Sequence, residues 1–414
     1  MTLLETLGRQ AKQATSAIAN LSLDTRNAIL ETMAQALENQ QDSIITANKK
    51  DLAQYQATLS GPMQKRLTLT AQDIHNIAVS LRAVIDLPDP LAGPYPTWHN
   101  HADLKIIKKT VPLGVVAMIY EARPNVTVDA AALAIKSGNA IILRGGKEAL
   151  NTNIVLTHIL RQALQQHNLN PNIIQLITDT SHETVAELLH LRQAIDVLIP
   201  RGSAKFIDFV VKNATVPVIE TGAGNTHIFV DDTMDENKAI QIIINAKTQK
   251  PSVCNAAEKL LIHENIAETF LPKIANALID AGVTLRGDEA SQAIVSNIQP
   301  ATDQDWSTEY NDLIMAVHIV KNIDDAIDWI NQYTTHHSET IISTHPQHVT
   351  QFMNAIDAAV VYQNASSRFT DGFEFGFGAE IGISTQKLHA RGPMGLPALT
   401  TIKYEIYGDG QIRE

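Results

Sequence analysis

The hydrophobic and polar positions of this chain repeat with a helical period over residues 1–85. Apolar side chains recur there at the i, i+3, i+4 spacing that places them on one face of a helix. The clearest such run is Ile29, Leu30, Met33 and Leu37. Residues 86–96 then concentrate proline and glycine, which is typical of a loop or linker. The pattern predicts a helical N-terminal region followed by a new structural unit.

After this linker, short apolar runs alternate with segments of helix length. Residues 104–107 nearly alternate in polarity, which indicates a half-exposed strand, whereas 115–119 is apolar throughout and indicates a buried one. Further strand candidates are 141–143, 173–177, 197–199, 216–219, 228–230, 259–263, 283–285, 313–320, 340–343 and 358–362. Strands that alternate with helices pair in parallel through right-handed crossovers, so this order predicts an α/β fold. Because open sheets rarely exceed about ten strands, we expect two sheets.

Three further segments bear on the organisation of the chain. The boundary between the sheets is predicted at Glu220–Asn225, where ETGAGN supplies a turn after an apolar strand. The segment 373–382 is rich in aromatic residues and glycine, and it is interpreted as a close-packed wall or crossing segment. Residues 399–407 alternate again and need a partner strand. Pairing with the strand predicted at 101–111 would form a projecting flap used in oligomerisation.

Composition and charge exclude several classes of protein. Hydrophobic residues make up 44% and charged residues 18%, close to ordinary globular usage. The formal net charge of -12 argues against a surface that neutralises nucleic-acid phosphates. No apolar stretch reaches the ~18 residues of a membrane helix, and the N-terminus lacks the apolar core of a secretory signal. We therefore predict a cytoplasmic protein with no nucleic-acid or membrane partner.

The chain has a single cysteine, Cys254, which excludes an intramolecular disulfide and a cysteine-rich zinc site. Such a residue is either inert core filling or a nucleophile. Pro251 and Ser252 break the preceding helix, and 255–258 is predicted to open a helical turn. Cys254 would then lie at a helix N-terminus, where the dipole lowers the pKa of a thiol. Lys247 and Lys250 would add positive charge if they face inward.

Three loops that follow predicted strands are candidate ligand sites. Glu220 begins a glycine-rich turn, which is either part of a ligand site at a strand end or a turn with a capping acid. Arg201-Gly202-Ser203 joins a strand to a helix N-terminus, an arrangement suited to a dinucleotide phosphate. Arg144 and Lys147 flank two glycines, either in a solvated loop or at a cofactor rim. The histidines show no metal-ligand spacing such as H-E-x-x-H, so no metal site is predicted.

Five segments together resemble the gamma-glutamyl phosphate reductase family of the aldehyde dehydrogenase superfamily. In chain order they are PLGVVAMIYEARPNVTVDAAALAIKSGNAIILRGG, VLIPRG, VIETGAGNTHIFVD, AKTQKPSVCNAAEKLLIH and GISTQKLHARGPMGL. The likeness extends over nearly the whole chain. It implies two open doubly wound sheets with a β-strand oligomerisation flap. The implied parts are a nucleotide-binding domain at 1–219, a catalytic domain at 220–372, and a return segment with the C-terminal oligomerisation strand at 373–414.

The resemblance also implies roles for individual residues. Cys254 corresponds to the nucleophile, and Glu220 to the superfamily's general base. Asn125 corresponds to the oxyanion donor, although YEARPN departs from the superfamily's usual tryptophan-asparagine pair. The implied cofactor contacts are Arg201, Gly202 and Ser203 to a phosphate, Glu309 to a ribose, and Arg144 and Lys147 to the 2′-phosphate of NADPH. Arg368 and Arg391 are candidates for the charged groups of the substrate.

The implied reaction is the NADPH-dependent reduction of L-glutamyl 5-phosphate to L-glutamate 5-semialdehyde through a thioester on Cys254, a step of proline biosynthesis. Because phosphate leaves without an activated water, Glu220 has two possible roles, proton donor or structural residue. The implied partners are further copies of the chain in a homo-oligomer and functional coupling to glutamate 5-kinase. Two alternatives stay open: an oxidative semialdehyde dehydrogenase, and a non-catalytic structural protein on the same fold.

Overall fold

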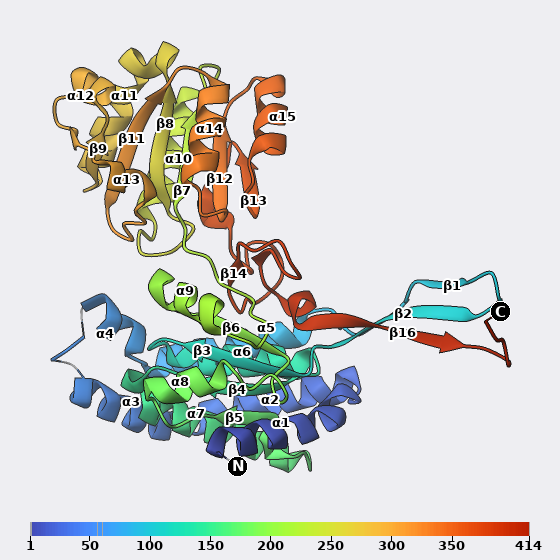
Figure 1. Cartoon of the computed structure of the whole chain (residues 1–414). Helices are drawn as coiled ribbons and strands as arrows, with labels where there is room; N and C mark the ends of the chain where they lie inside the picture. Colours follow the sequence, from blue (N-terminus) through green and yellow to red (C-terminus); the bar gives the residue numbers. More distant parts are fainter. Residues whose placement is uncertain (1, 56, 60, 414) are drawn as a thin grey trace. The chain divides into compact units, whose positions relative to one another are not determined.

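The computed structural model describes residues 2–55, 57–59 and 61–413. The chain divides into two compact units (Figure 1). Unit 1 comprises Met1–Glu220, Gly376–Gly382 and Met394–Glu414, and unit 2 comprises Thr221–Phe375 and Ile383–Pro393. The segment interpreted as a crossing therefore does pass from one unit to the other, between Phe375 and Gly376.

Unit 1 is built on a parallel sheet of four strands in the order β5-β4-β3-β6. The strands are β3 (Val115–Tyr120), β4 (Ala140–Arg144), β5 (Ile174–Leu176) and β6 (Val197–Arg201). The helices are α1 (Leu3–Ala19), α2 (Leu23–Asn39), α3 (Gln41–Tyr55), α4 (Gly61–Leu67), α5 (Ala71–Asp86), α6 (Pro124–Lys136), α7 (Leu150–Gln166), α8 (His182–Leu188) and α9 (Ala204–Asn213). All of β3 is buried, as its unbroken apolar sequence predicts.

Helices cover the sheet of unit 1 through shared apolar clusters. Leu4 and Ala11 of α1 belong to one buried cluster with Ala117 of β3 and Ile142 of β4. Helix α1 begins with a capping box, in which Thr2 and Glu5 satisfy each other's backbone N–H groups. These local signals agree with the burial of the apolar face, which explains why the N-terminal helical pattern is readable from sequence.

Three antiparallel strands form the flap, which projects from the sheet of unit 1 in Figure 1. The strands are β1 (Thr97–His99), β2 (Lys105–Pro112) and β16 (Thr400–Tyr407). Strand β16 pairs with β2 along its whole length, from Thr400 opposite Pro112 to Tyr407 opposite Lys105. The predicted pairing of the C-terminal strand is confirmed.

Unit 2 contains a seven-stranded parallel sheet in the order β10-β9-β11-β8-β7-β12-β13. The strands are β7 (Thr226–Val230), β8 (Ala257–His263), β9 (Thr284–Gly287), β10 (Gln299–Pro300), β11 (Ile314–Val320), β12 (Ser338–Ile342) and β13 (Val360–Gln363). The helices are α10 (Glu236–Thr248), α11 (Glu264–Asp280), α12 (Glu289–Ile294), α13 (Asp303–Ser307), α14 (Ile323–Tyr333) and α15 (Pro346–Ala355). Strands β14 (Ile383–Ser384) and β15 (Gly392–Pro393) form a small separate ladder.

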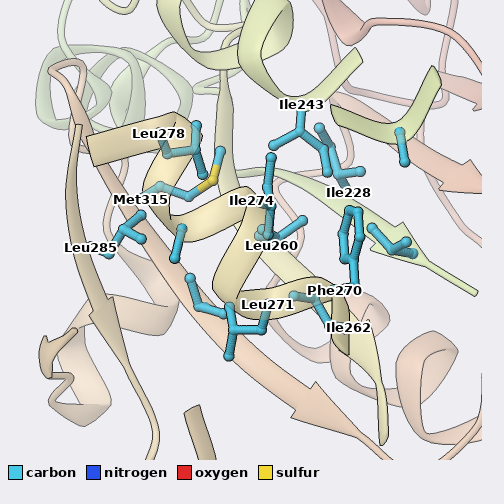
Figure 2. Close-up of a cluster of buried hydrophobic side chains, with 14 of the residues drawn as sticks. Ile228, Ile243, Leu260, Ile262, Phe270, Leu271, Ile274, Leu278, Leu285 and Met315 are labelled. Atoms are coloured by element: carbon cyan, nitrogen blue, oxygen red, sulfur yellow. The ribbon is translucent and has the colours of Figure 1, made fainter. Parts of the chain in front are cut away.

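The main core of unit 2 lies between the sheet and helices α10 and α11. Figure 2 shows Ile243 of α10 and Phe270 and Ile274 of α11 packed with Ile228 and Leu260 of the sheet. All five side chains are fully buried. This core holds β8 in the centre of the sheet, between β7 and β11, and so fixes the end of the loop that precedes it.

The predicted α/β class with two doubly wound sheets and a flap is confirmed. Two local predictions are wrong. Residues 216–219 do not form a regular strand, since only a single bridge joins Val218 to Leu198. The aromatic side chains of 373–382 are not a close-packed wall, because Phe373, Phe375 and Phe377 are exposed. Among the helices that the structure describes, none has the length and apolar character to cross a membrane.

Candidate active site

Cys254, the candidate nucleophile, lies in a turn between α10 and β8. Helix α10 ends at Thr248 and β8 begins at Ala257. No helix begins after Cys254 in this described segment, so the prediction that a helix N-terminus activates the thiol is wrong. The physical reason is that residues 257–263 pair with β7 and β11 and are drawn into the sheet as a strand. Cys254 itself is half-buried and is not in a disulfide.

The main chain of Cys254 packs against the turn that begins with Glu220. A Cβ atom on Gly224 would lie 1.5 Å from the carbonyl oxygen of Cys254, so only glycine fits there without a shift. Glu309 accepts a hydrogen bond from the backbone N–H of Gly224 at 2.8 Å. Glu309, the predicted ribose contact, therefore holds the turn beside Cys254 in this structure.

On its other side, the Cys254 turn is held by the segment 366–370. Asn255 donates through Nδ2 to the carbonyl oxygen of Thr370 at 2.8 Å, and Ser367 donates to the carbonyl oxygen of Asn255 at 2.7 Å. Arg368 donates through Nε to Gln249 at 2.7 Å, and its guanidinium is close enough to Cys254 for their charges to interact. The structure thus brings Arg368, Cys254 and Glu309 to one turn of unit 2.

A buried ion pair lies at the base of this turn. Lys247 of α10 and Glu258 of β8 are fully buried, with Nζ 3.2 Å from Oε2. Burial lowers the pKa of Lys247 and raises the pKa of Glu258, and the charges of Lys247 and Lys259 oppose the rise. The inward orientation of Lys247 is confirmed, but Glu258 compensates its charge. The sequence signal for this missed ion pair is the charged pair Glu258 and Lys259 inside an otherwise apolar strand.

Arg391, the second candidate for substrate binding, makes different contacts. Its guanidinium donates to Asp357 at 2.8 Å, and Lys387 pairs with the same carboxylate. Hydrogen bonds from Lys387 and Arg391 lower the pKa of Asp357 to about 2. The contacts described for Arg391 are therefore with Asp357, in the loop between α15 and β13, and not with the Cys254 turn.

In unit 1, Asn125 and Arg201 lie near the ends of β3 and β6, which pair with each other up to Tyr120 and Arg201. Asn125, in the first turn of α6, donates through Nδ2 to Asp129 at 3.0 Å. Arg201, at the end of β6, donates to the carbonyl oxygen of Ile381 at 3.3 Å, and its charge acts on Asp129. Glu220 is half-buried and is the last residue of the first segment of unit 1. Asp129 was not among the predicted site residues.

The segment Arg201–Ser203 joins β6 to α9, with Ser203 as the N-cap of the helix. The backbone N–H of Ser203 donates to the carboxylate of Glu121 at 3.0 Å. This N–H group is therefore directed at an anionic oxygen. Arg144 donates to the carbonyl oxygen of Thr180 at 2.6 Å, whereas Lys147 is exposed at the start of a short 3₁₀ helix, Lys147–Ala149.

Comparison with known proteins decides the family. The model of the aldehyde dehydrogenase family matches residues 4–309. The chain is 68% identical to a gamma-glutamyl phosphate reductase of Leuconostoc citreum, over 99% of both chains. A crystal structure of gamma-glutamyl phosphate reductase from Thermotoga maritima is 44% identical, with a TM-score of 0.97 and full coverage of both chains. The chain belongs to the gamma-glutamyl phosphate reductases.

More distant structures share only the fold of this family. A propionaldehyde dehydrogenase of Rhodopseudomonas palustris, solved with bound CoA and an acylated cysteine, is 14% identical with a TM-score of 0.70. The matched region covers 98% of this chain and 97% of the propionaldehyde dehydrogenase. At this identity the likeness supports the aldehyde dehydrogenase architecture.

One group in the described residues has the spacing of a metal site, namely Asp231, Asp232 and His263. The Nδ1 atom of His263 accepts a hydrogen bond from the backbone N–H of Asn265 at 3.1 Å. A neutral ring that accepts at Nδ1 carries its proton on Nε2, the atom 3.9 Å from Asp232. That nitrogen has no lone pair to offer a cation, so the group fits a hydrogen-bonded helix cap better than a metal centre.

Proposed function

We propose that this chain reduces L-glutamyl 5-phosphate to L-glutamate 5-semialdehyde and phosphate, a step of proline biosynthesis, with Cys254 as the nucleophile. One observation carries the proposal beyond family membership. The only cysteine of the chain lies half-buried in a turn that is held from two sides, by Gly224 and by the segment 366–370. These contacts fix the main chain of the turn, and covalent catalysis requires a nucleophile that is held in a defined place.

The family uses a nicotinamide cofactor, and the residues of unit 1 fit one. The N–H group of Ser203 donates a hydrogen bond to the carboxylate of Glu121. The start of α9 can therefore also donate to an anionic oxygen of another kind, such as that of a dinucleotide phosphate. Arg201, Gly202 and Ser203 would hold the phosphates, and Glu309 would contact a ribose. The bound cofactor supplies a hydride, and we propose that it is NADPH.

The thiolate of Cys254 attacks the acyl carbon of the substrate, and phosphate leaves from the tetrahedral adduct to give a thioester. After reduction, the thiohemiacetal on Cys254 collapses, which releases the aldehyde and regenerates the thiolate. We propose Asn125 as oxyanion donor. Its amide has two N–H bonds and the bond to Asp129 uses one, which leaves the other for the substrate oxygen. Such a donor is typically worth ~3 kcal/mol.

Charge recognition completes the proposed site. The guanidinium of Arg368, close to Cys254, is suited to a carboxylate or phosphate of the substrate. Arg391 is the second candidate, and it would first have to exchange its partner Asp357. Glu220 serves as a proton donor or a structural residue, since no water needs activation when phosphate is the leaving group.

The reverse reaction tests this function against oxidative dehydrogenase chemistry. With glutamate 5-semialdehyde and NADP, we expect NADPH formation to require inorganic phosphate or arsenate, because the thioester on Cys254 needs an acceptor oxyanion. Sulfate at equal ionic strength is the control and should not support turnover. Rapid NADPH formation in phosphate-free buffer, with glutamate as the product, would establish the oxidative alternative.

A charge reversal at Lys147 tests the cofactor proposal. A 2′-phosphate carries nearly two negative charges, so Lys147→Glu replaces attraction by repulsion and should lower the NADPH to NADH ratio of kcat/KM. An exposed pair is worth only ~0.2 to 1 kcal/mol, so Lys147→Ala should change the ratio by a few-fold at most. Lys321→Glu, an exposed reversal in unit 2, is the matched control. An unchanged ratio in Lys147→Glu would mean that this side chain points into solvent and does not contact the 2′-phosphate.

The flap supports a proposal on assembly. Trp98, Ile402, Tyr404 and Ile406 are exposed apolar side chains on its strands. Exposed apolar surface of this extent marks an association site, so we propose that the chain forms a homo-oligomer through the flap. We also propose a cytoplasmic location and functional coupling to glutamate 5-kinase, whose product is the substrate.

A further inference from the structure

Helix α6 is buried except at two positions. Of its residues Pro124–Lys136, only Asn125 and Asp129 reach solvent, and each is half-buried. They are four residues apart, so they lie on one side of the helix, one turn from each other. The open strip of an otherwise apolar helix thus carries an amide and a carboxyl group.

The carboxyl group of Asp129 has capacity for a further partner. Among the described residues, Asn125 is its only hydrogen-bond donor, and that bond uses Oδ2. Desolvation by the surrounding protein raises the pKa of Asp129 to about 6, against the lowering effects of the Asn125 hydrogen bond and the charge of Arg201. A carboxylate in such surroundings gains more from a cationic partner than an exposed carboxylate does.

We propose that Asp129 binds the α-ammonium group of the glutamyl substrate and so selects for an amino acid over a simple acyl chain. This inference rests on the proposed function, since Asn125 is taken to contact the reacting carbonyl group. The four single bonds from that carbonyl carbon to the α-nitrogen span about 5 Å when extended. Asn125 and Asp129 are four residues apart, a rise of about 6 Å along the helix, and their bonded side-chain atoms are 3.0 Å apart. A chain of this length can therefore reach the second N–H bond of Asn125 with one end and Oδ1 of Asp129 with the other.

The proposal separates recognition of charge from support of Asn125. Asn in place of Asp129 keeps an oxygen that accepts the hydrogen bond from Asn125 but removes the negative charge. Ala removes both. A role in recognition therefore predicts that Asp129→Asn behaves like Asp129→Ala toward the aminated substrate, whereas a role in positioning alone predicts that Asp129→Asn behaves like the wild type.

The test measures phosphate-dependent NADP reduction in wild type, Asp129→Asn and Asp129→Ala with two aldehydes. One is glutamate 5-semialdehyde, and the other is 5-oxopentanoate, which has hydrogen in place of the α-ammonium group. For the first, Asp129→Asn should raise KM at least about 10-fold, as expected for loss of a charged hydrogen bond. For the second, wild type and Asp129→Asn should agree within about 2-fold.

Other outcomes are decisive as well. Wild-type kinetics of Asp129→Asn with both aldehydes, or an equal loss with both, would overturn the ammonium site. An equal loss together with weaker NADPH binding and a lower Tm would show a structural role. A wild-type enzyme that turns over neither aldehyde in the presence of phosphate would instead reject the proposed function, and the ammonium site with it.

Discussion

A chain with alanine in place of Cys254 is expected to lose at least ~10³-fold of its reductase turnover, as enzymes do when a covalent nucleophile is removed. A methyl group forms no thioester, and the chain holds no second cysteine to replace it. The phosphate turn at Arg201–Ser203 belongs to unit 1 and is untouched, so NADPH binding should stay within about 2-fold. Steady-state turnover and titration of NADPH fluorescence provide the two measurements.

Intact-mass spectrometry adds a direct control for this prediction. Wild-type enzyme mixed with the acyl phosphate in the absence of NADPH should gain the mass of one glutamyl group, and Cys254→Ala should gain none. Cys254→Ser keeps the size of the side chain but offers a much weaker nucleophile, so it should also fall below a hundredth of the wild-type rate. An alanine variant that retains a tenth of the wild-type rate would contradict the covalent mechanism.

The fold was predictable where one periodic signal decides the structure. The unbroken apolar run at 115–119 indicated a buried strand, and the alternation at 399–407 indicated a strand in need of a partner. Both predictions depend on hydrophobic burial along a single element. The segment 216–219 has the same local signal, yet it forms only one bridge, because strand formation also requires a neighbour along its whole length.

For the candidate site, the sequence indicated candidate residues but not the contacts that hold them. The segment after Cys254 contains good helix formers, and local propensity favoured a helix there. Its place between β7 and β11 overrides that propensity, because burying β8 in the sheet outweighs one turn of helix. The ion pair Lys247–Glu258 needs two elements in contact, which sequence alone does not reveal. The pair Asn125 and Asp129 is local, and its i, i+4 spacing was the overlooked signal.

Gly224 is the position where the smallest change should disturb the site most. Its φ does not lie in the left-handed region, so alanine introduces no backbone strain. The conflict is purely steric. A Cβ atom would lie 1.5 Å from the carbonyl oxygen, 2.3 Å from the carbonyl carbon and 2.7 Å from the Cα of Cys254. All three are backbone atoms, so no side-chain rotation relieves the overlap, and the Cys254 turn itself has to move.

Gly224→Ala should therefore reduce kcat about 100-fold, since a displacement of about 1 Å at a reacting group can cost that much. Overpacking of this kind should also lower the free energy of unfolding by ~1 to 3 kcal/mol, so activity is compared well below the Tm. Gly61→Ala adds the same methyl group where nothing lies within 4 Å, and it should match the wild type. The alkylation rate of Cys254 by iodoacetamide should change in Gly224→Ala and stay at the wild-type value in Gly61→Ala. Wild-type kcat in Gly224→Ala would mean that the contact between these two turns does not position the nucleophile.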